Sequence, residues 1–221
     1  MLGIASLIRR MSRRLRPEMW SAAFALSAGN AAFARRDYMK ALQLWQPWAD
    51  RGNASAQYNV GLLHAQGLGV PQDEVEASRC YIKSANQGYP PAQHNLGCMY
   101  AAGSGLPRDD VVAVGWHRKS ANQGHAAAQY GLGFMYEVGQ GVSQDYAEAA
   151  CWYRKAADQG CADAQFGLAR LYAQGQGVPL DYVEAHRLFG SAASGYREDE
   201  ESRREAIEYR DQAASLVAAS N

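Results

Sequence analysis

The sequence predicts an all-α protein, a right-handed α-solenoid of antiparallel helix pairs. One pattern occurs four times at a spacing of 36 residues, and a fixed period of this length is typical of stacked helical repeats. Within each copy, apolar residues at helical spacing are followed by two glycines and then by an acidic residue that opens a second helical stretch. Each copy carries a glutamine in the same phase, at Gln57, Gln93, Gln129 and Gln165.

The repeats divide most of the chain into equal lengths. We expect a basic amino-terminal arm over 1–17, an opening tetratricopeptide-like helix pair over 18–52, four full repeats and a capping helix over 196–221. The full repeats cover 53–195 as 53–88, 89–124, 125–160 and 161–195. In the arm, five arginines follow an apolar stretch, which is the reverse of the order in a secretory signal. A frayed or helical arm, an organelle transit peptide and a weak contact with an anionic surface are the alternatives for it.

The first helix of a repeat, helix A, is predicted from apolar residues at three- and four-residue steps, as at Ala56, Val60 and Leu63. Gly67 then ends the helix, because glycine takes positive φ without a steric penalty. A small residue recurs inside helix A, where a neighbouring helix can approach closely, at Gly61, Gly97, Gly133 and Ala169.

The second helix, helix B, begins at an aspartate. Asp73 precedes Glu76 by three residues, and this pair suits an N-cap with an acidic residue at the third helical position. In the second repeat Val112 follows Asp109 at that spacing, so we expect the weakest cap there. Small and aromatic residues then alternate along helix B, which indicates core packing.

The two ends of the repeat array vary the same plan. Residues 20–52 keep the helix-turn-helix pattern around Asp37, Ala41 and Trp45 but lack the glycine loop. Past Gly195 the period stops, and one apolar side of a charged helix is typical of a terminal cap. That side consists of Ala206, Tyr209, Ala213, Leu216 and Val217.

The third repeat carries the fullest set of motifs. They are Ala-Gln-Tyr-x-x-Gly at 128–133, Gly-Gln-Gly-Val at 139–142, Asp-Tyr-Ala-Glu-Ala at 145–149 and Trp-Tyr-Arg-Lys-Ala-Ala at 152–157. These motifs resemble Sel1-like repeats, relatives of tetratricopeptide repeats with a longer glycine-containing turn. The resemblance covers about two thirds of the chain as full repeats. It implies a helical solenoid that works as an adaptor in protein complexes.

Charge and hydropathy exclude several partner classes. Lys+Arg and Asp+Glu both number 22, so no global field favours nucleic acid. Lysines recur in phase on helix B, but acidic residues share those helices, and we expect no nucleic-acid partner. No stretch approaches the ~18 apolar residues of a membrane span. We therefore expect no transmembrane helix and a cytoplasmic protein.

The cysteines and histidines predict no metal site. The four cysteines fall at unlike phases, and we expect them to be reduced and packed as small apolar side chains. The histidines likewise show no ligand spacing, and zinc, other metals and cofactors are not expected. These residues are Cys80, Cys98, Cys151 and Cys161, with His64, His94, His117, His125 and His186.

No catalytic motif is present that would predict an enzyme. The sequence lacks Gly-x-Ser-x-Gly, Ser-x-x-Lys, His-Glu-x-x-His and a phosphate-binding loop. Some proteins of the family that the chain resembles are linked to lactam binding or hydrolysis. A lactam hydrolase is therefore the remote alternative, but no nucleophile with its base is apparent.

The predicted function is that of a non-catalytic scaffold that binds a peptide or protein partner. In tetratricopeptide-like solenoids helix A lines the concave wall, and we expect the partner there. The alternative function is that of an inhibitor or immunity-like protein that occludes one partner. For the aromatic row at Tyr58, the alternative role is packing against a neighbouring helix. The predicted surface consists of a first row, Tyr58, His94, Tyr130 and Phe166, a second row, Leu62, Cys98, Phe134 and Arg170, and then Glu137 and Gln174.

Overall fold

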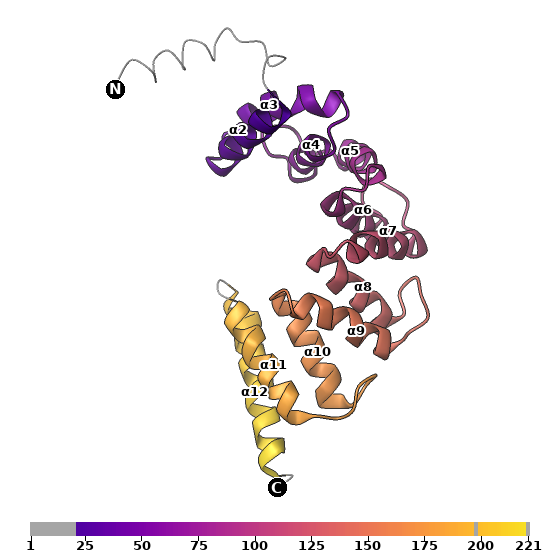
Figure 1. Cartoon of the computed structure of the whole chain (residues 1–221), viewed down its shortest axis with the longest axis vertical. Helices are drawn as coiled ribbons and strands as arrows, with labels where there is room; N and C mark the ends of the chain where they lie inside the picture. The colour runs from indigo at the N-terminus through magenta and orange to yellow at the C-terminus, as the bar shows by residue number, and fades with distance from the viewer. Residues whose placement is uncertain (1–20, 197–198, 220–221) are drawn as a thin grey trace, which may run out of the picture. The chain divides into compact units, whose positions relative to one another are not determined.

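The computed structural model describes residues 21–196 and 199–219 of the 221-residue chain. Within these ranges the protein is all-helical, with eleven helices and no strand (Figure 1). The predicted all-α repeat fold is confirmed, whereas the basic arm over 1–17 lies outside the described residues. The helices are α2 (Ala22–Ala34), α3 (Tyr38–Asp50), α4 (Ala54–Gln66), α5 (Glu74–Asn86), α6 (Pro90–Ala102), α7 (Asp110–Asn122), α8 (Ala126–Val138), α9 (Tyr146–Ala157), α10 (Ala162–Gln174), α11 (Tyr182–Gly195) and α12 (Glu200–Ala219).

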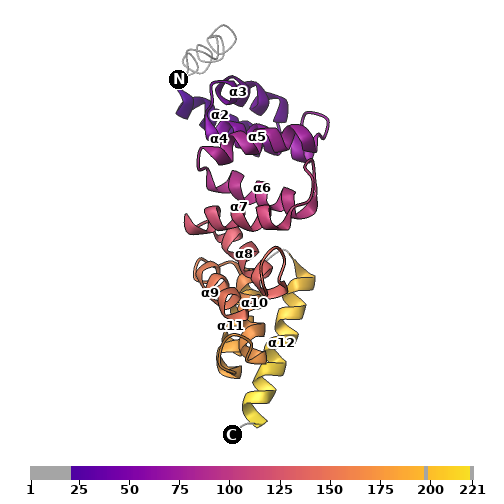
Figure 2. The same cartoon turned by 90° about the vertical axis from the view of Figure 1, so that its right-hand side faces the viewer.

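The chain forms two compact parts. Of the described residues, the amino-terminal part contains 21–92 and 104–106, and the carboxy-terminal part contains 93–103, 107–196 and 199–219. In the amino-terminal part α2 packs on α3, α3 on α4 and α4 on α5. In the carboxy-terminal part each helix from α7 to α12 packs on the next, and α12 runs alongside α11 (Figures 1 and 2). None of the described helices is both long and apolar enough to cross a bilayer.

A ring of helix B fills the core of every repeat. The glycine of helix A leaves the room for it: a Cβ on Gly133 would lie 2.7 Å from Cδ1 of Tyr153, and one on Gly61 would lie 2.9 Å from Cε1 of Tyr81. The close approach of helix B predicted at this position is confirmed: its ring lies nearest, and the backbone carbonyl oxygen of Ala149 lies 3.3 Å from the same Cβ position on Gly133. The buried rings share one phase of the repeat, at Trp45, Tyr81, His117, Tyr153 and Phe189.

The glycine turns form as predicted. Gly67, Gly139 and Gly175 end their helices in the left-handed conformation, with φ of 65°, 73° and 64°. The second glycine of a turn has another reason to be glycine. Gly141 lies against the backbone carbonyl of Asp110, where any Cβ would overlap the carbonyl oxygen. The turn after one helix A therefore docks on the start of the preceding helix B.

The aspartate caps of helix B form both with and without the glutamate. The Asp109 carboxylate accepts a hydrogen bond from the Val112 N–H at 3.0 Å, close to the 2.9 Å between Asp73 and the Glu76 N–H. The second cap therefore forms without the glutamate, although the Asp145 carboxylate of the third repeat accepts two N–H bonds, from Ala147 and Glu148. In both caps the aspartate N–H donates to a backbone carbonyl near the end of helix A, from Asp73 to His64 and from Asp109 to Tyr100, each at 2.9 Å, so it does not need a glutamate partner.

The in-phase glutamines connect neighbouring repeats. Gln129 is buried, and its Nε2 donates to the carbonyl of Ala121 in α7 at 3.2 Å. Its Oε1 accepts from Gln159, which follows α9, at 2.7 Å. Equivalent bonds join Gln57 to Ala49 and to Gln87. One buried amide thus ties three helix ends together and fixes helix A against both neighbours.

Candidate functional site

The predicted binding surface lies on alternate helices. In the carboxy-terminal part it is carried by α6, α8 and α10, the helix-A members of their repeats. Tyr58 and Leu62 lie on α4 of the amino-terminal part, and both are half-buried. The residues of the carboxy-terminal part are His94 and Cys98 on α6, Tyr130, Phe134 and Glu137 on α8, and Phe166, Arg170 and Gln174 on α10.

The first row of rings packs on helix B of its own repeat. Tyr130 stacks on Tyr153 with ring centroids 5.8 Å apart, and Phe166 meets Phe189 edge-on at 5.3 Å. Tyr58 makes the corresponding contact with Tyr81 at 5.7 Å. All three first-row rings nevertheless stay half-buried. These rings therefore pack on helix B, and part of each ring remains accessible to solvent.

A cavity of about 400 Å³ opens between α6 and α8. Its lining is mostly apolar and includes Tyr130, Phe134 and Met135 from α8, facing His94 and Cys98 from α6. Phe134 is 44% exposed although it is a large apolar residue. This cavity and its lining, here called the α6–α8 groove, bring together four of the predicted binding residues.

Glu137 has a different role from the predicted one. It is only 8% exposed, and the Tyr153 hydroxyl donates to its Oε2 at 2.5 Å while Arg170 forms an ion pair with its Oε1. Burial, and then the bond to this carboxylate, raise the pKa of Tyr153. The carboxylate is satisfied inside the protein, so it joins α8, α9 and α10 instead of facing a partner. The Arg170 side chain remains 39% exposed.

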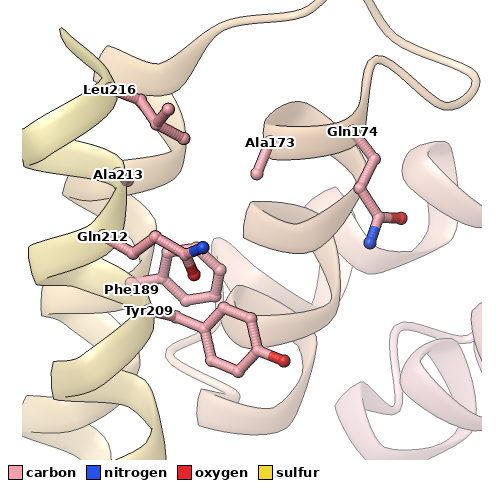
Figure 3. Close-up of a pocket in the computed structure, with 7 residues that line it drawn as sticks. All are labelled: Ala173, Gln174, Phe189, Tyr209, Gln212, Ala213 and Leu216. Atoms are coloured by element: carbon pink, nitrogen blue, oxygen red, sulfur yellow. The ribbon is translucent and has the colours of Figure 1, made fainter. Parts of the chain in front are cut away.

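Gln174 lies at a second, smaller cavity (Figure 3). This cavity of about 180 Å³ is bounded by α10, α11 and α12. Figure 3 shows the Tyr209 and Phe189 rings near one another, with Gln174 on the facing helix. The sequence indicates Tyr209 and Leu216 only as an apolar side of the capping helix, and their place at a cavity follows from how α12 packs on α11.

Two histidines and a cysteine meet beside the groove. His94 and Cys98 lie one turn apart on α6, with Nε2 and Sγ separated by 3.7 Å, and His117 of α7 lies with its ring centroid 5.2 Å from that of His94. Burial, with a contribution from neighbouring histidines, lowers the pKa of His94 and His117 to about 4. Both imidazoles are therefore neutral at pH 7.

The expectation that the histidines show no ligand spacing is wrong for this cluster. One signal was present in the sequence, because His94 and Cys98 are four residues apart and so share a helix face. The third member comes from the next helix, and its approach depends on how α6 and α7 pack. The position of His117 in the repeat was a second signal, because the other repeats place a buried aromatic ring of helix B at the same position.

The cysteines are not uniformly apolar core residues. Cys80 is buried in the core, and burial raises the pKa of its thiol to about 11. Cys98 and Cys151 are exposed, and Cys161 is half-buried. The expectation of packing inside the protein is therefore wrong for the two exposed thiols.

Two of the three in-phase lysines of helix B lie over aromatic rings of their own helix, whereas Lys83 has Cys80 at the corresponding position. The Lys119 Nζ is 4.0 Å from the centroid of Trp116, and the Lys155 Nζ is 3.8 Å from that of Trp152. Such cation–π contacts account for Lys119 and Lys155 without a phosphate ligand.

Comparison with known proteins identifies similar chains. A solved protective antigen of uropathogenic Escherichia coli that displays an SLR fold is 30% identical, with a TM-score of 0.75 over 88% of this chain and 46% of that chain. The solved Sel1 repeat protein from Oxalobacter formigenes is 31% identical, with a TM-score of 0.69 over 86% of this chain and 84% of that chain. A component of the ERAD-associated E3 ubiquitin-protein ligase of Candida glabrata is 40% identical over 57 residues, which are 26% of this chain and 7% of that protein.

A known family model matches most of the chain. The Sel1 repeat model matches five consecutive segments, 20–53, 54–89, 90–125, 126–161 and 162–195. The match includes the opening helix pair α2 and α3, which lacks the long glycine loop, and it ends before α12. Together, these segments contain every helix pair described above. The chain therefore belongs to the Sel1 repeat family.

Proposed function

We propose that this protein is a non-catalytic scaffold that binds a peptide or protein partner in the α6–α8 groove. Sel1 repeats generally serve as protein-interaction scaffolds. The observation that carries the proposal is the exposed Phe134 ring beside an apolar cavity of about 400 Å³. Aromatic residues, including phenylalanine, are enriched in the cores of protein–protein interfaces.

The chemistry of the groove favours an apolar anchor on the partner. Its volume lies within the range of about 300–1,000 Å³ of pockets that bind a ligand, which leaves room for a leucine or aromatic side chain. Glu137, the acidic residue that sequence analysis places on this surface, is held by Tyr153 and Arg170. We therefore infer a partner segment that inserts a bulky apolar side chain next to Phe134.

The groove is also held in place before binding. Gln129 fixes α8 to both neighbouring helix ends, and the Tyr130–Tyr153 stack packs α8 on α9. A surface that is already ordered loses little conformational entropy on association, which favours binding by a short segment.

Affinity capture with matched variants tests this proposal. The wild-type chain, Phe134→Glu and Val183→Glu are immobilised in parallel and exposed to a lysate of the organism that encodes the chain. Val183, on α11, is 65% exposed and lies outside the groove lining, so its variant controls for an added surface charge.

A partner that binds wild type and Val183→Glu but not Phe134→Glu would support the groove. Retention of every specific partner by Phe134→Glu would contradict it. Circular dichroism melts of the three chains, expected to coincide, show whether the loss reflects binding instead of unfolding. An occluding inhibitor would use the same surface, and the activity of the captured partner with and without this chain separates that alternative from an adaptor.

A further inference from the structure

The second full repeat differs from the others at its ring positions. In the other three, the ring of helix A meets the ring of helix B, and both are tyrosine or phenylalanine. In the second, both are histidine and stand 5.2 Å apart. The exposed Cys98 occurs one turn after His94. The aligned pairs are Tyr58 with Tyr81, His94 with His117, Tyr130 with Tyr153, and Phe166 with Phe189.

Core packing does not account for this exchange. His117 lies between Gly97 and Gly131, as Tyr153 lies between Gly133 and Gly167, so the backbone leaves similar space for a tyrosine. The buried Nδ1 atoms of His94 and His117 have no hydrogen-bond partner among the described residues. A buried unsatisfied polar group costs about 1–3 kcal/mol. Two imidazoles are thus kept at the positions where the fourth repeat holds two phenylalanine rings, which have no polar atom to leave unsatisfied.

The three side chains are placed to share one cation. His94, Cys98 and His117 each offer a ligand atom, and these atoms all lie within 4.8 Å of one another. A tetrahedral zinc site, with bonds of about 2.0–2.1 Å to nitrogen and 2.3 Å to sulfur, separates its ligand atoms by about 3.3–3.6 Å. The 3.7 Å between His94 Nε2 and Cys98 Sγ is already close to this spacing.

We propose that His94, Cys98 and His117 bind one Zn²⁺ ion, with the fourth coordination position open toward the α6–α8 groove. One thiolate with two imidazoles suits zinc and disfavours Mg²⁺ and Ca²⁺, which prefer oxygen ligands. The exposure of Cys98 provides a path for the ion. On binding, the Cys98 thiol gives up its proton to solvent and its sulfur forms the bond to zinc. His125, although near His94, is engaged as the N-cap of α8, where its Nδ1 accepts from Ala128.

Metal titration of the reduced, full-length chain tests the site. Calorimetry with Zn²⁺ gives stoichiometry and affinity, and Co²⁺ serves as a spectroscopic probe of tetrahedral coordination and of a cobalt–thiolate bond. The variants are His117→Tyr, which restores the residue found at Tyr81 and Tyr153, and Cys98→Ser. Cys151→Ser is the matched control, because Cys151 is also exposed but belongs to no ligand cluster among the described residues.

We expect one Zn²⁺ per chain, undisturbed by Mg²⁺, and a thiolate-to-cobalt charge-transfer band. His117→Tyr and Cys98→Ser should each weaken zinc binding by more than about 100-fold, since changing even an outer-shell residue costs about 10–100-fold, and Cys98→Ser should abolish the band. Cys151→Ser should behave as wild type. Absence of zinc binding by wild type, or binding and a charge-transfer band that survive Cys98→Ser, would overturn the proposal. Because Cys98 is exposed, this variant keeps the test decisive even where His117→Tyr fails to fold.

Discussion

Buried amide side chains and aromatic rings stabilise this protein more than its exposed charged side chains do. Gln129 makes bonds to two neighbouring helix ends, and Tyr153 fills the space left by Gly133 while its hydroxyl reaches Glu137. Most ion pairs of the described residues are exposed, and exposed pairs contribute about 0–1 kcal/mol each. We therefore expect substitution of the recurring glutamine to lower the free energy of unfolding strongly for a side chain of its size.

Gln129→Leu should lower the free energy of unfolding by about 1–3 kcal/mol, because the Ala121 carbonyl and the Gln159 amide then lose their buried partner. Urea denaturation followed by circular dichroism measures the change. Gln66→Leu, at an exposed position of α4, is the control and should change stability by less than about 0.5 kcal/mol. Equal effects of the two substitutions would show that the glutamine bonds are not structural.

At the scale of single elements, a turn glycine can be required both by its own backbone conformation and by a close contact with a neighbouring helix. Gly141 adopts a φ of 70° and also lies against the backbone of Asp110. Gly124 adopts a φ of 87°, but a Cβ there would meet no atom within 4 Å. The two glycines thus separate the cost of the backbone conformation from the cost of a collision.

Gly124→Ala should destabilise the protein by about 1–2 kcal/mol, the cost of placing a Cβ in the left-handed region. Gly141→Ala should cost a further 1–3 kcal/mol or so, because the turn must move away from α7. Thermal and urea melts of both variants provide the comparison. A Gly141→Ala variant no less stable than Gly124→Ala would mean that the turn is not docked on α7.

The caps of helix B should depend on aspartate alone. Asp109→Ala should cost about 0.5–2 kcal/mol, as for other N-caps, although its repeat lacks the glutamate. Glu76→Ala should cost less than about 0.5 kcal/mol, since the Glu76 side chain forms an exposed ion pair with Arg79. Urea melts measure both. A larger loss for Glu76→Ala than for Asp109→Ala would restore the capping box as the stabilising element.

At the scale of the whole molecule, period and phase predict the fold but only part of the site. Helix A, the glycine turn and helix B follow from local signals, so their order and approximate bounds are evident from the sequence. Phase also places Phe134 next to the first row. The pairing of Glu137 with Arg170, 33 residues later, depends on how α8 and α10 approach and on side-chain rotamers. His94 and His117 stand at the phases of the ring pairs in the other repeats, but that these two phases are in contact becomes evident only from how helix B packs on helix A.

Two exposed thiols allow the central claim, that the partner occupies the α6–α8 groove, to be measured directly. Cys98 lines the groove, whereas Cys151 is exposed on α9. Alkylation of each thiol is followed by mass spectrometry on the reduced chain, with a chelator present, before and after the captured partner is added. Binding in the groove predicts that Cys98 alkylation slows severalfold while Cys151 reacts at an unchanged rate. An unchanged rate at Cys98 when the partner is bound would contradict the account.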